Sequence, residues 1–339
     1  MPIFPSEIIL QIVESIVSPT SRKIHQADDP VTITLISLTL TCKLTYPAAR
    51  RLLFRHCLFI DETLRLDSLL DRSGYFVDDD ADGPEAYSLF LAPFPAPTLD
   101  EWTIHQIDRL FTRICSSLRV LVVDMPLRNI WPYEDLDGIR RPLREAFCRL
   151  KMLEDVCSVQ DELFLRAVDD YEPQVWTLWP RLRRLALYNP DIDDYFVAEL
   201  QKCPDLAHLV IMRPDSYMYE RIPDHLAEGF PFGLQRVVVA NTRGGHIIDA
   251  DARSCEDSSV WRNSFWGRMV LSQYPEGTGE EREMLFHIDV PWDPKDQIDD
   301  ISVCQKWLLE HAVDGTVWEV PGTHCSMEYA LTEIKFGPR

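Results

Sequence analysis

A short strand pattern that begins with leucine is the feature that most constrains the fold of this chain. The pattern Leu-x-x-Leu-x-Leu, or a shortened form of it, recurs with 24 to 35 residues between successive first leucines. The copies occupy residues 118–123, 153–156, 182–187, 206–211 and 234–239. We expect the first, fourth and sixth positions to face the core and the remaining positions to point outward. One copy cannot bury its own apolar face, so the copies must stack as they do in a solenoid.

Amphipathic helical stretches lie between these strands and complete the expected unit. Ile107, Leu110, Phe111 and Ile114 recur at helical spacing, and a second stripe begins at Tyr195. This alternation predicts an α/β fold in which residues 99–339 form a curved, mostly parallel sheet with outer helices. The pattern weakens after residue 241. Strand-like runs at 269–271 and 285–290 then precede a final helix at 298–311, which we expect to cap the solenoid.

Residues 1–60 are expected to form a separate helical domain. Pro5 and Glu7 suit the first turn of a helix that continues through Ile8, Ile9 and Ile12. Two further helices, around residues 35–44 and 47–53, and a strand at 57–60 are expected to follow. Residues 61–98 contain three consecutive aspartates and several prolines, and we expect them to be an acidic, Pro-rich linker or a surface excursion.

Charge and composition exclude several classes of protein. The net charge is −21, and the basic clusters at 140–141 and 181–184 are short and lie among carboxylates, so we expect no nucleic-acid partner. No window approaches the ~18 consecutive apolar residues of a membrane span, and no leader-like run opens the sequence. We therefore expect no membrane partner and a cytoplasmic or nuclear location. The nine cysteines are scattered singly, which is typical of reduced, buried thiols.

Three segments of the first 60 residues resemble an F-box. They are Pro5-Ser6-Glu7-Ile8-Ile9-x-x-Ile12, Leu38-Thr39-Leu40-Thr41-Cys42-Lys43 and Arg50-Arg51-Leu52-Leu53-Phe54. Relative to the usual form of that family, Phe4 replaces a leucine and the interval from Ser18 to Thr34 is longer. The resemblance implies a three-helix box that inserts apolar side chains into a partner. The residues implied to contact that partner are Pro5, Ile8, Ile9, Ile12, Leu38, Cys42 and Leu52.

The recurring strands resemble degenerate leucine-rich repeats. The clearest copies are Lys202-Cys203-Pro204-Asp205-Leu206-x-x-Leu209-x-Ile211 and Trp179-Pro180-Arg181-Leu182-x-x-Leu185-x-Leu187. A box followed by such repeats implies a substrate receptor of an SCF-type ubiquitin ligase. The box would bind the small adaptor subunit and, through it, a cullin, while the repeats would recruit a target protein. The alternative is a repeat-based interaction scaffold that takes no part in ubiquitination.

Aromatic and sulfur-containing side chains after the strands are candidate target contacts. They are Tyr188, Met212, Tyr217 and Tyr219, at positions where a solenoid usually presents a binding surface. The alternative for these side chains is packing beneath loops, since tyrosines are often half-buried.

No motif of a catalytic, cofactor or metal site is present in the sequence. Phosphate-binding glycine loops, G-x-S-x-G and H-E-x-x-H are absent, and no Cys-x-x-Cys occurs. His324-Cys325 has no second pair at zinc spacing. We therefore expect a chain that is not an enzyme, binds no cofactor or metal, and acts by bringing other proteins together.

Overall fold

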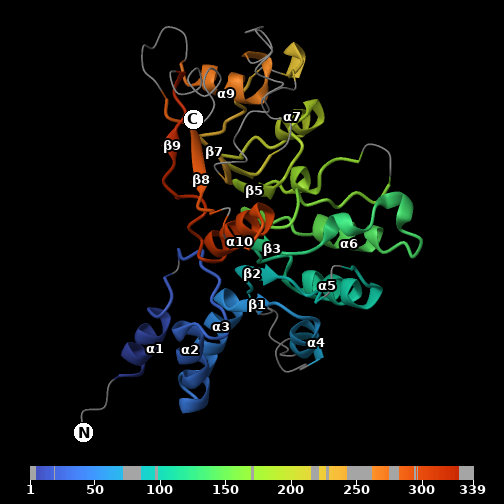
Figure 1. Ribbon diagram of the computed structural model, residues 1–339. Helices are drawn as coiled ribbons and strands as arrows, with labels where there is room; N and C mark the ends of the chain where they lie inside the picture. The colour runs from blue at the N-terminus through green and yellow to red at the C-terminus, as the bar shows by residue number, and fades with distance from the viewer. Residues whose placement is uncertain are drawn as a thin grey trace. The chain divides into compact units, whose positions relative to one another are not determined.

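A computed structural model gives the fold of the chain (Figure 1). It describes residues 5–18, 20–71, 85–95, 98–168, 172–214, 221–226, 229–242, 262–274, 282–293, 295 and 297–327. The chain divides into two compact units, which we describe separately. Unit 1 comprises Met1–Cys157, Phe164–Trp179 and Glu310–Thr316, and unit 2 comprises Ser158–Leu163, Pro180–Leu309 and Val317–Arg339.

Unit 1 begins with three helices, which we call the box: α1 (Ser6–Glu14), α2 (Pro30–Thr41) and α3 (Tyr46–His56). The Asp29 carboxylate caps α2 by accepting the Val31 N–H at 2.8 Å, and Pro30 supplies a preset backbone angle at the first helical position. Helix α3 packs against both α1 and α2. The strand expected at 57–60 is present as β1 (Leu58–Ile60).

The rest of unit 1 alternates strands with helices. Strands β1, β2 (Ser88–Leu91) and β3 (Val120–Val123) are parallel, and β4 (Asp155–Ser158) follows β3 in the sheet. Helices α4 (Thr63–Asp71), α5 (Glu101–Ile114) and α6 (Arg140–Cys148) pack side by side in chain order. The short helices η1 (Leu127–Asn129), η2 (Pro132–Glu134) and η3 (Val175–Leu178) complete this unit.

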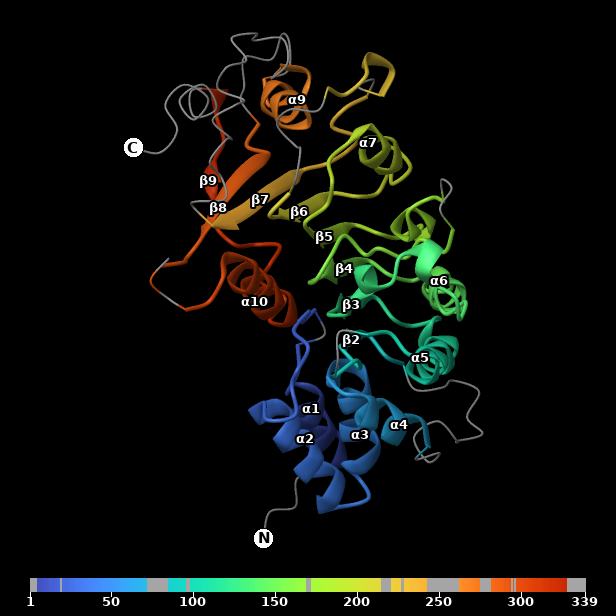
Figure 2. The ribbon, with the colours of Figure 1, turned by 45° about the vertical axis from the view of Figure 1, so that its right-hand side comes forward.

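Unit 2 contains the next parallel strands, β5 (Arg184–Tyr188), β6 (His208–Met212), β7 (Arg236–Thr242) and β8 (Leu285–Val290). The short β9 (Thr323–His324) pairs antiparallel with β8. In Figure 2, α7 (Asp194–Leu200) and α9 (Phe265–Ser272) lie on one side of these strands and α10 (Asp300–Val313) lies on the other. The short helix η4 (Asp224–Leu226) packs near α7. Asp193 caps α7 by accepting the Phe196 N–H, so the acidic run 191–194 supplies a helix cap.

The leucine pattern is buried as expected, but the alternate positions are buried too. In each of the five copies the strand begins two residues after the first leucine, and these leucines are at most 5% exposed: Leu118, Leu153, Leu182, Leu206 and Leu234. Side chains at the alternate positions, which we expected to point to solvent, are also buried, among them Val120, Val122, Ala186, Val210 and Val238. Both faces of these strands are therefore covered, as in mostly parallel α/β sheets.

Two segments contain elements that the sequence did not predict. Residues 61–98 were expected to be a linker or a surface excursion; they include α4 and β2, and β2 pairs with both β1 and β3. The run 269–271 was expected to be a strand but lies in helix α9. Ser264 caps the start of that helix, because its hydroxyl oxygen accepts the Gly267 N–H.

Candidate protein-interaction surface

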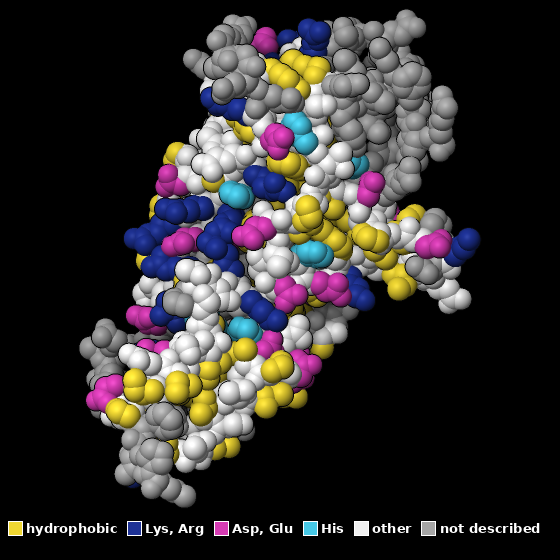
Figure 3. Space-filling model, turned by 90° about the vertical axis from the view of Figure 1, so that its left-hand side faces the viewer, with side chains coloured by type: hydrophobic (Ala, Val, Ile, Leu, Met, Phe, Trp, Pro, Cys, Tyr) yellow, Lys and Arg dark blue, Asp and Glu magenta, His cyan; other side chains and the backbone are white. Residues whose placement is uncertain are grey.

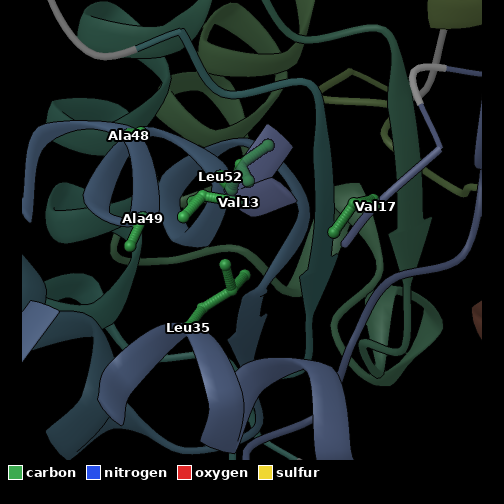
Figure 4. Packing of buried hydrophobic residues seen from close by; sticks show 6 residues of the cluster. All are labelled: Val13, Val17, Leu35, Ala48, Ala49 and Leu52. Carbon is green, nitrogen blue, oxygen red and sulfur yellow. The ribbon is translucent and has the colours of Figure 1, made fainter. Parts of the chain in front are cut away.

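The box has a small core built from all three of its helices. Val13 of α1, Leu35 of α2, and Ala49 and Leu52 of α3 are buried together (Figure 4). The two alanines of α3, Ala48 and Ala49, allow the helices to approach closely because their side chains are small. This core leaves large parts of α1 and α2 outside it.

Helix α2 carries no charged residue, and its apolar side chains are spread around the helix with serines and threonines between them. Only Thr32 and Leu35 are buried, whereas Ile33, Ile36 and Leu40 are exposed, Leu40 to 81%. An amphipathic surface helix normally turns charged side chains to solvent, and a helix that is apolar all round is normally buried. Helix α2 therefore has an apolar surface that the described part of this chain does not cover.

The hydroxyl groups of α2 further reduce the polarity of its surface. Thr34 donates to Pro30 O at 2.7 Å, Ser37 to Ile33 O at 2.8 Å, and Thr41 to Ser37 O at 2.8 Å. Each hydroxyl proton is thus satisfied by the backbone of its own helix.

Helix α1 and the start of α3 add to this surface. Ile8 and Ile12 of α1 are exposed, Ile12 to 59%, as are Leu44 and Tyr46 before and within the first turn of α3. We define the apolar box surface by seven exposed residues: Ile8, Ile12, Ile33, Ile36, Leu40, Leu44 and Tyr46. Figure 3 shows hydrophobic side chains gathered over the lower part of the molecule, at the level of the box.

The segment between α1 and α2 is bound to the rest of unit 1. The Arg22 guanidinium pairs with the buried Asp155 carboxylate at 2.6 Å, and the Ile24 N–H donates to Val313 O at 2.8 Å. The His25 N–H donates to His56 O at 2.9 Å. Ile24 is fully buried. The longer interval between the first two box helices therefore contributes to the folded core of unit 1.

The structure separates the predicted adaptor contacts into three groups. Pro5, Ile8, Ile12 and Cys42 are exposed, whereas Ile9 and Leu38 are half-buried. Leu52 is buried in the box core, so it does not belong to the exposed surface of the box. The pKa of the exposed Cys42 thiol is lowered, chiefly by its hydrogen bond with the Thr45 hydroxyl.

Five residues of the apolar box surface were missed by sequence reasoning. They are Ile33, Ile36, Leu40, Leu44 and Tyr46. The signal that could have identified them is the absence of charge from Pro30 to Cys42, a stretch that is too apolar for a helix with one face in water.

The predicted target contacts are not on the surface where the structure describes them. Tyr188 is 4% exposed and Met212 is fully buried, so both side chains pack within the fold. Tyr217 and Tyr219 lie outside the described residues. Burial raises the pKa of the Tyr188 phenol, and the nearby cation of Arg213 partly offsets that rise.

Helix α10 accounts for the burial of Tyr188 and Met212. Within unit 2, Arg213, directly after β6, pairs with Asp300 at the start of α10 at 3.4 Å. The Cys304 thiol of α10 faces the backbone at Thr242, the last residue of β7, and is itself fully buried. The face of β5–β7 on which we expected a target surface is thus occupied by a helix of the same chain.

The described residues offer no metal site. No group of three or more His, Cys, Asp or Glu side chains among them is arranged to hold a metal ion. His324 forms a 2.9 Å hydrogen bond with Gln273, and Cys325 is buried, so this pair belongs to the packing of unit 2. Within the same parts of the chain, no helix is both long and apolar enough to span a bilayer.

Comparison with known proteins does not assign a family. No protein-family model matches the chain, and a search of curated proteins returns no significant match. The structure and the sequence pattern define the class: a mixed α/β chain with a mostly parallel sheet, preceded by a helical box with an uncovered apolar surface.

Proposed function

We propose that this chain is a substrate receptor of an SCF-type ubiquitin ligase, in which the apolar box surface binds the small adaptor subunit. The adaptor would connect the chain to a cullin, and the repeat body would recruit the target protein. The chain itself would carry out no chemistry. The observation that supports this function most is the uncharged helix α2, whose Ile33, Ile36 and Leu40 have no cover among the described residues.

The physical basis for binding is the burial of preformed apolar anchors. Exposed isoleucine and leucine side chains on rigid helices lose little backbone entropy on binding, because the helices are already folded. Transfer of a fully exposed leucine out of water contributes about 1.5 to 3 kcal/mol. Several such anchors in one interface suit the helix-in-groove mode of recognition. The same exposed side chains would favour aggregation if no partner covered them.

Co-purification of the full chain with the ligase adaptor tests this function. We expect a stoichiometric complex with the wild-type chain. An Ile8→Asp, Ile12→Asp double variant and an Ile36→Asp, Leu40→Asp double variant should each lose it, because a buried, unpaired carboxylate is strongly unfavourable in an apolar interface. The control is Leu64→Asp, which places one such carboxylate on an exposed leucine of α4 outside the box.

The outcome also decides between the two candidate roles. If the complex survives both double variants, the apolar box surface is not the site that binds the adaptor. If the folded wild-type chain forms no complex with the adaptor, the ubiquitin-ligase role fails. A repeat-based scaffold that takes no part in ubiquitination is then the remaining function.

A further inference from the structure

Three large apolar side chains are exposed in the turn between β3 and α6, within unit 1. Trp131, Tyr133 and Leu136 are 40%, 66% and 94% exposed, although they lie close together in the chain. Single exposed apolar side chains are common on protein surfaces, whereas a group of them is typical of an interaction site. Tryptophan and tyrosine are also frequent anchors of protein–protein interfaces. We call these three residues the aromatic turn.

A buried arginine holds the aromatic turn in place. Arg140, at the start of α6, is 2% exposed. Its guanidinium donates to four backbone carbonyl oxygens, those of Leu127, Ile130, Phe164 and Arg166. These hydrogen bonds connect the segment before the aromatic turn to the segment that follows β4. The backbone that carries Trp131 is therefore fixed on two sides.

Two carboxylates close the turn itself. Glu134 accepts the Trp131 N–H at 3.2 Å, and Asp135 accepts the N–H groups of Ile139 and Arg140, each at 2.9 Å. The second pair of bonds attaches the turn to the start of α6. A surface that is fixed in this way before a partner arrives loses little conformational entropy on binding.

The two rings of the turn differ in how much of their surface is open. Trp131 packs edge-on against Phe164 with ring centres 5.1 Å apart, and the Arg128 guanidinium carbon lies 6.0 Å from its ring centre. The Tyr133 ring lies beside Trp131, nearly parallel to it, with ring centres 6.3 Å apart. An open aromatic face attracts a cation. Tyr133 is therefore the ring that can receive a cation from a partner, and Trp131 supports it.

The charge around Tyr133 is negative. Glu134 and Asp137 are both exposed, and the Asp137 carboxylate has no cation as a partner among the described residues. The whole chain carries a net charge of −21. A cationic partner is attracted by both the local and the overall field, whereas an acidic partner is repelled.

We propose that the aromatic turn binds a segment of a partner protein in which a lysine or arginine stands beside an apolar residue. The cation contacts Tyr133 and pairs with Asp137, and the apolar side chain packs on Leu136. The turn follows the carboxyl end of a parallel strand, and such loops commonly carry the binding residues of α/β proteins. If the chain is a ligase receptor, as proposed above, this segment belongs to the target that it recruits.

Fluorescence anisotropy with three labelled peptides of equal length tests this site on the full chain alone. The first peptide alternates lysine and leucine, the second has serine in place of leucine, and the third has glutamine in place of lysine. We expect the lysine–leucine peptide to bind more tightly than the other two and to weaken as salt rises. The lysine–serine peptide measures the attraction by overall charge, and the glutamine–leucine peptide measures apolar binding without a cation.

Variants of the turn locate the binding. Tyr133→Ser and Leu136→Ser should each weaken the lysine–leucine peptide about fivefold or more, as expected for anchors. Tyr133→Phe keeps the ring face and should stay within about twofold of wild type. Asp137→Asn should weaken binding about two- to fivefold, because the ion pair is exposed.

The matched controls remove the same kinds of side chain elsewhere in unit 1. Leu64→Ser removes an exposed leucine, and Asp28→Asn removes an exposed carboxylate. Each should leave the affinity for the lysine–leucine peptide unchanged. All the substituted side chains are exposed, so the unfolding midpoints of the variants should match that of the wild-type chain.

Four results would overturn the proposal. The first is a lysine–leucine peptide that does not bind, and the second is a lysine–serine peptide that binds as tightly, which would assign the binding to overall charge. The third is wild-type affinity in Tyr133→Ser and Leu136→Ser. The fourth is a dimer in sedimentation velocity that these two variants lose, which would make the turn an interface between copies. The adaptor subunit is absent from this assay, so failure here is distinct from failure of the box to bind an adaptor.

Discussion

The box and the strands of unit 2 use similar apolar side chains in opposite ways. Strands β5–β7 bury the residues of both faces, and only their first positions remain half-buried. Helix α2 carries no charged residue, yet it buries only two of its residues and exposes Ile33, Ile36 and Leu40. The buried apolar side chains of the sheet stabilise the fold of this chain, whereas the exposed ones of the box can contact another protein. The predictions below test this division of roles.

The largest effect on stability is expected in the sheet. Leu209, at the centre of β6, is fully buried, so Leu209→Ala removes buried methyl groups and leaves a cavity. We expect the free energy of unfolding to fall by about 2 to 5 kcal/mol. Chemical denaturation of the two proteins measures this change. A loss below about 1 kcal/mol, the range of surface substitutions, would mean that the leucine pattern is not the core of unit 2.

A smaller loss is expected where the segment between α1 and α2 is tied to β4. Arg22→Met removes one ion-pair partner of the buried Asp155 carboxylate. Because Arg22 itself is partly exposed and water can replace it, we expect the free energy of unfolding to fall by about 2 kcal/mol, below the range for fully buried pairs.

The control for this ion pair is Arg51→Met. Arg51 pairs with Glu14 at 2.6 Å, but both side chains are more than half exposed. Exposed pairs contribute about 0 to 1 kcal/mol. Equal losses in the two variants would contradict a structural role for the Arg22–Asp155 pair.

The box should also lose stability in mild acid because of His56. Burial, with smaller contributions from Arg55 and His25, lowers the pKa of His56 from 6.5 to about 4. Between these two pH values the unfolded chain binds a proton that the folded chain does not, so stability falls as the pH falls. The wild-type chain should lose stability between neutral pH and about pH 5. In His56→Gln we expect this loss to be smaller by about 1 to 2 kcal/mol.

Denaturant unfolding at the two pH values measures this difference. The exposed His105→Gln variant is the matched control and should keep the wild-type dependence on pH. An unchanged dependence in His56→Gln would show that this imidazole is not kept neutral by burial.

The smallest effect on stability is expected on the apolar box surface. Leu40 is largely exposed, so Leu40→Ala should change the free energy of unfolding by less than about 0.5 kcal/mol. The same substitution should weaken binding of the proposed adaptor several-fold, because it removes an anchor from the interface. A large loss of stability would show that Leu40 packs within this chain.

The sequence was sufficient to predict the elements that repeat a strong local pattern. The leucine copies predicted β3 to β7 to within two or three residues at their starts, and the proline and acidic residues at positions 5 and 7 predicted the start of α1. These patterns report local burial, which the sequence encodes directly. Strand β2 was not predicted, because prolines and aspartates surround this four-residue strand and it depends on β1 and β3 for its hydrogen bonds.

The candidate surface was predicted only in part, for a different reason. Exposure depends on which distant element covers a residue, and the sequence does not contain that information in any local pattern. Tyr188 and Met212 follow the pattern of surface positions, but α10, more than 80 residues later in the chain, covers them. Leu52 was predicted to contact the adaptor and Leu40 was not, yet Leu52 lies in the box core and Leu40 is largely exposed.

Calorimetric titration of the ligase adaptor into the wild-type chain and the Leu40→Asp variant tests the central claim most directly. We predict binding with a negative change in heat capacity, the signature of buried apolar surface, and its loss in a variant whose unfolding midpoint is unchanged. A folded wild-type chain that does not bind, or a Leu40→Asp chain that binds as tightly as wild type, would contradict the claim that the apolar box surface receives the adaptor.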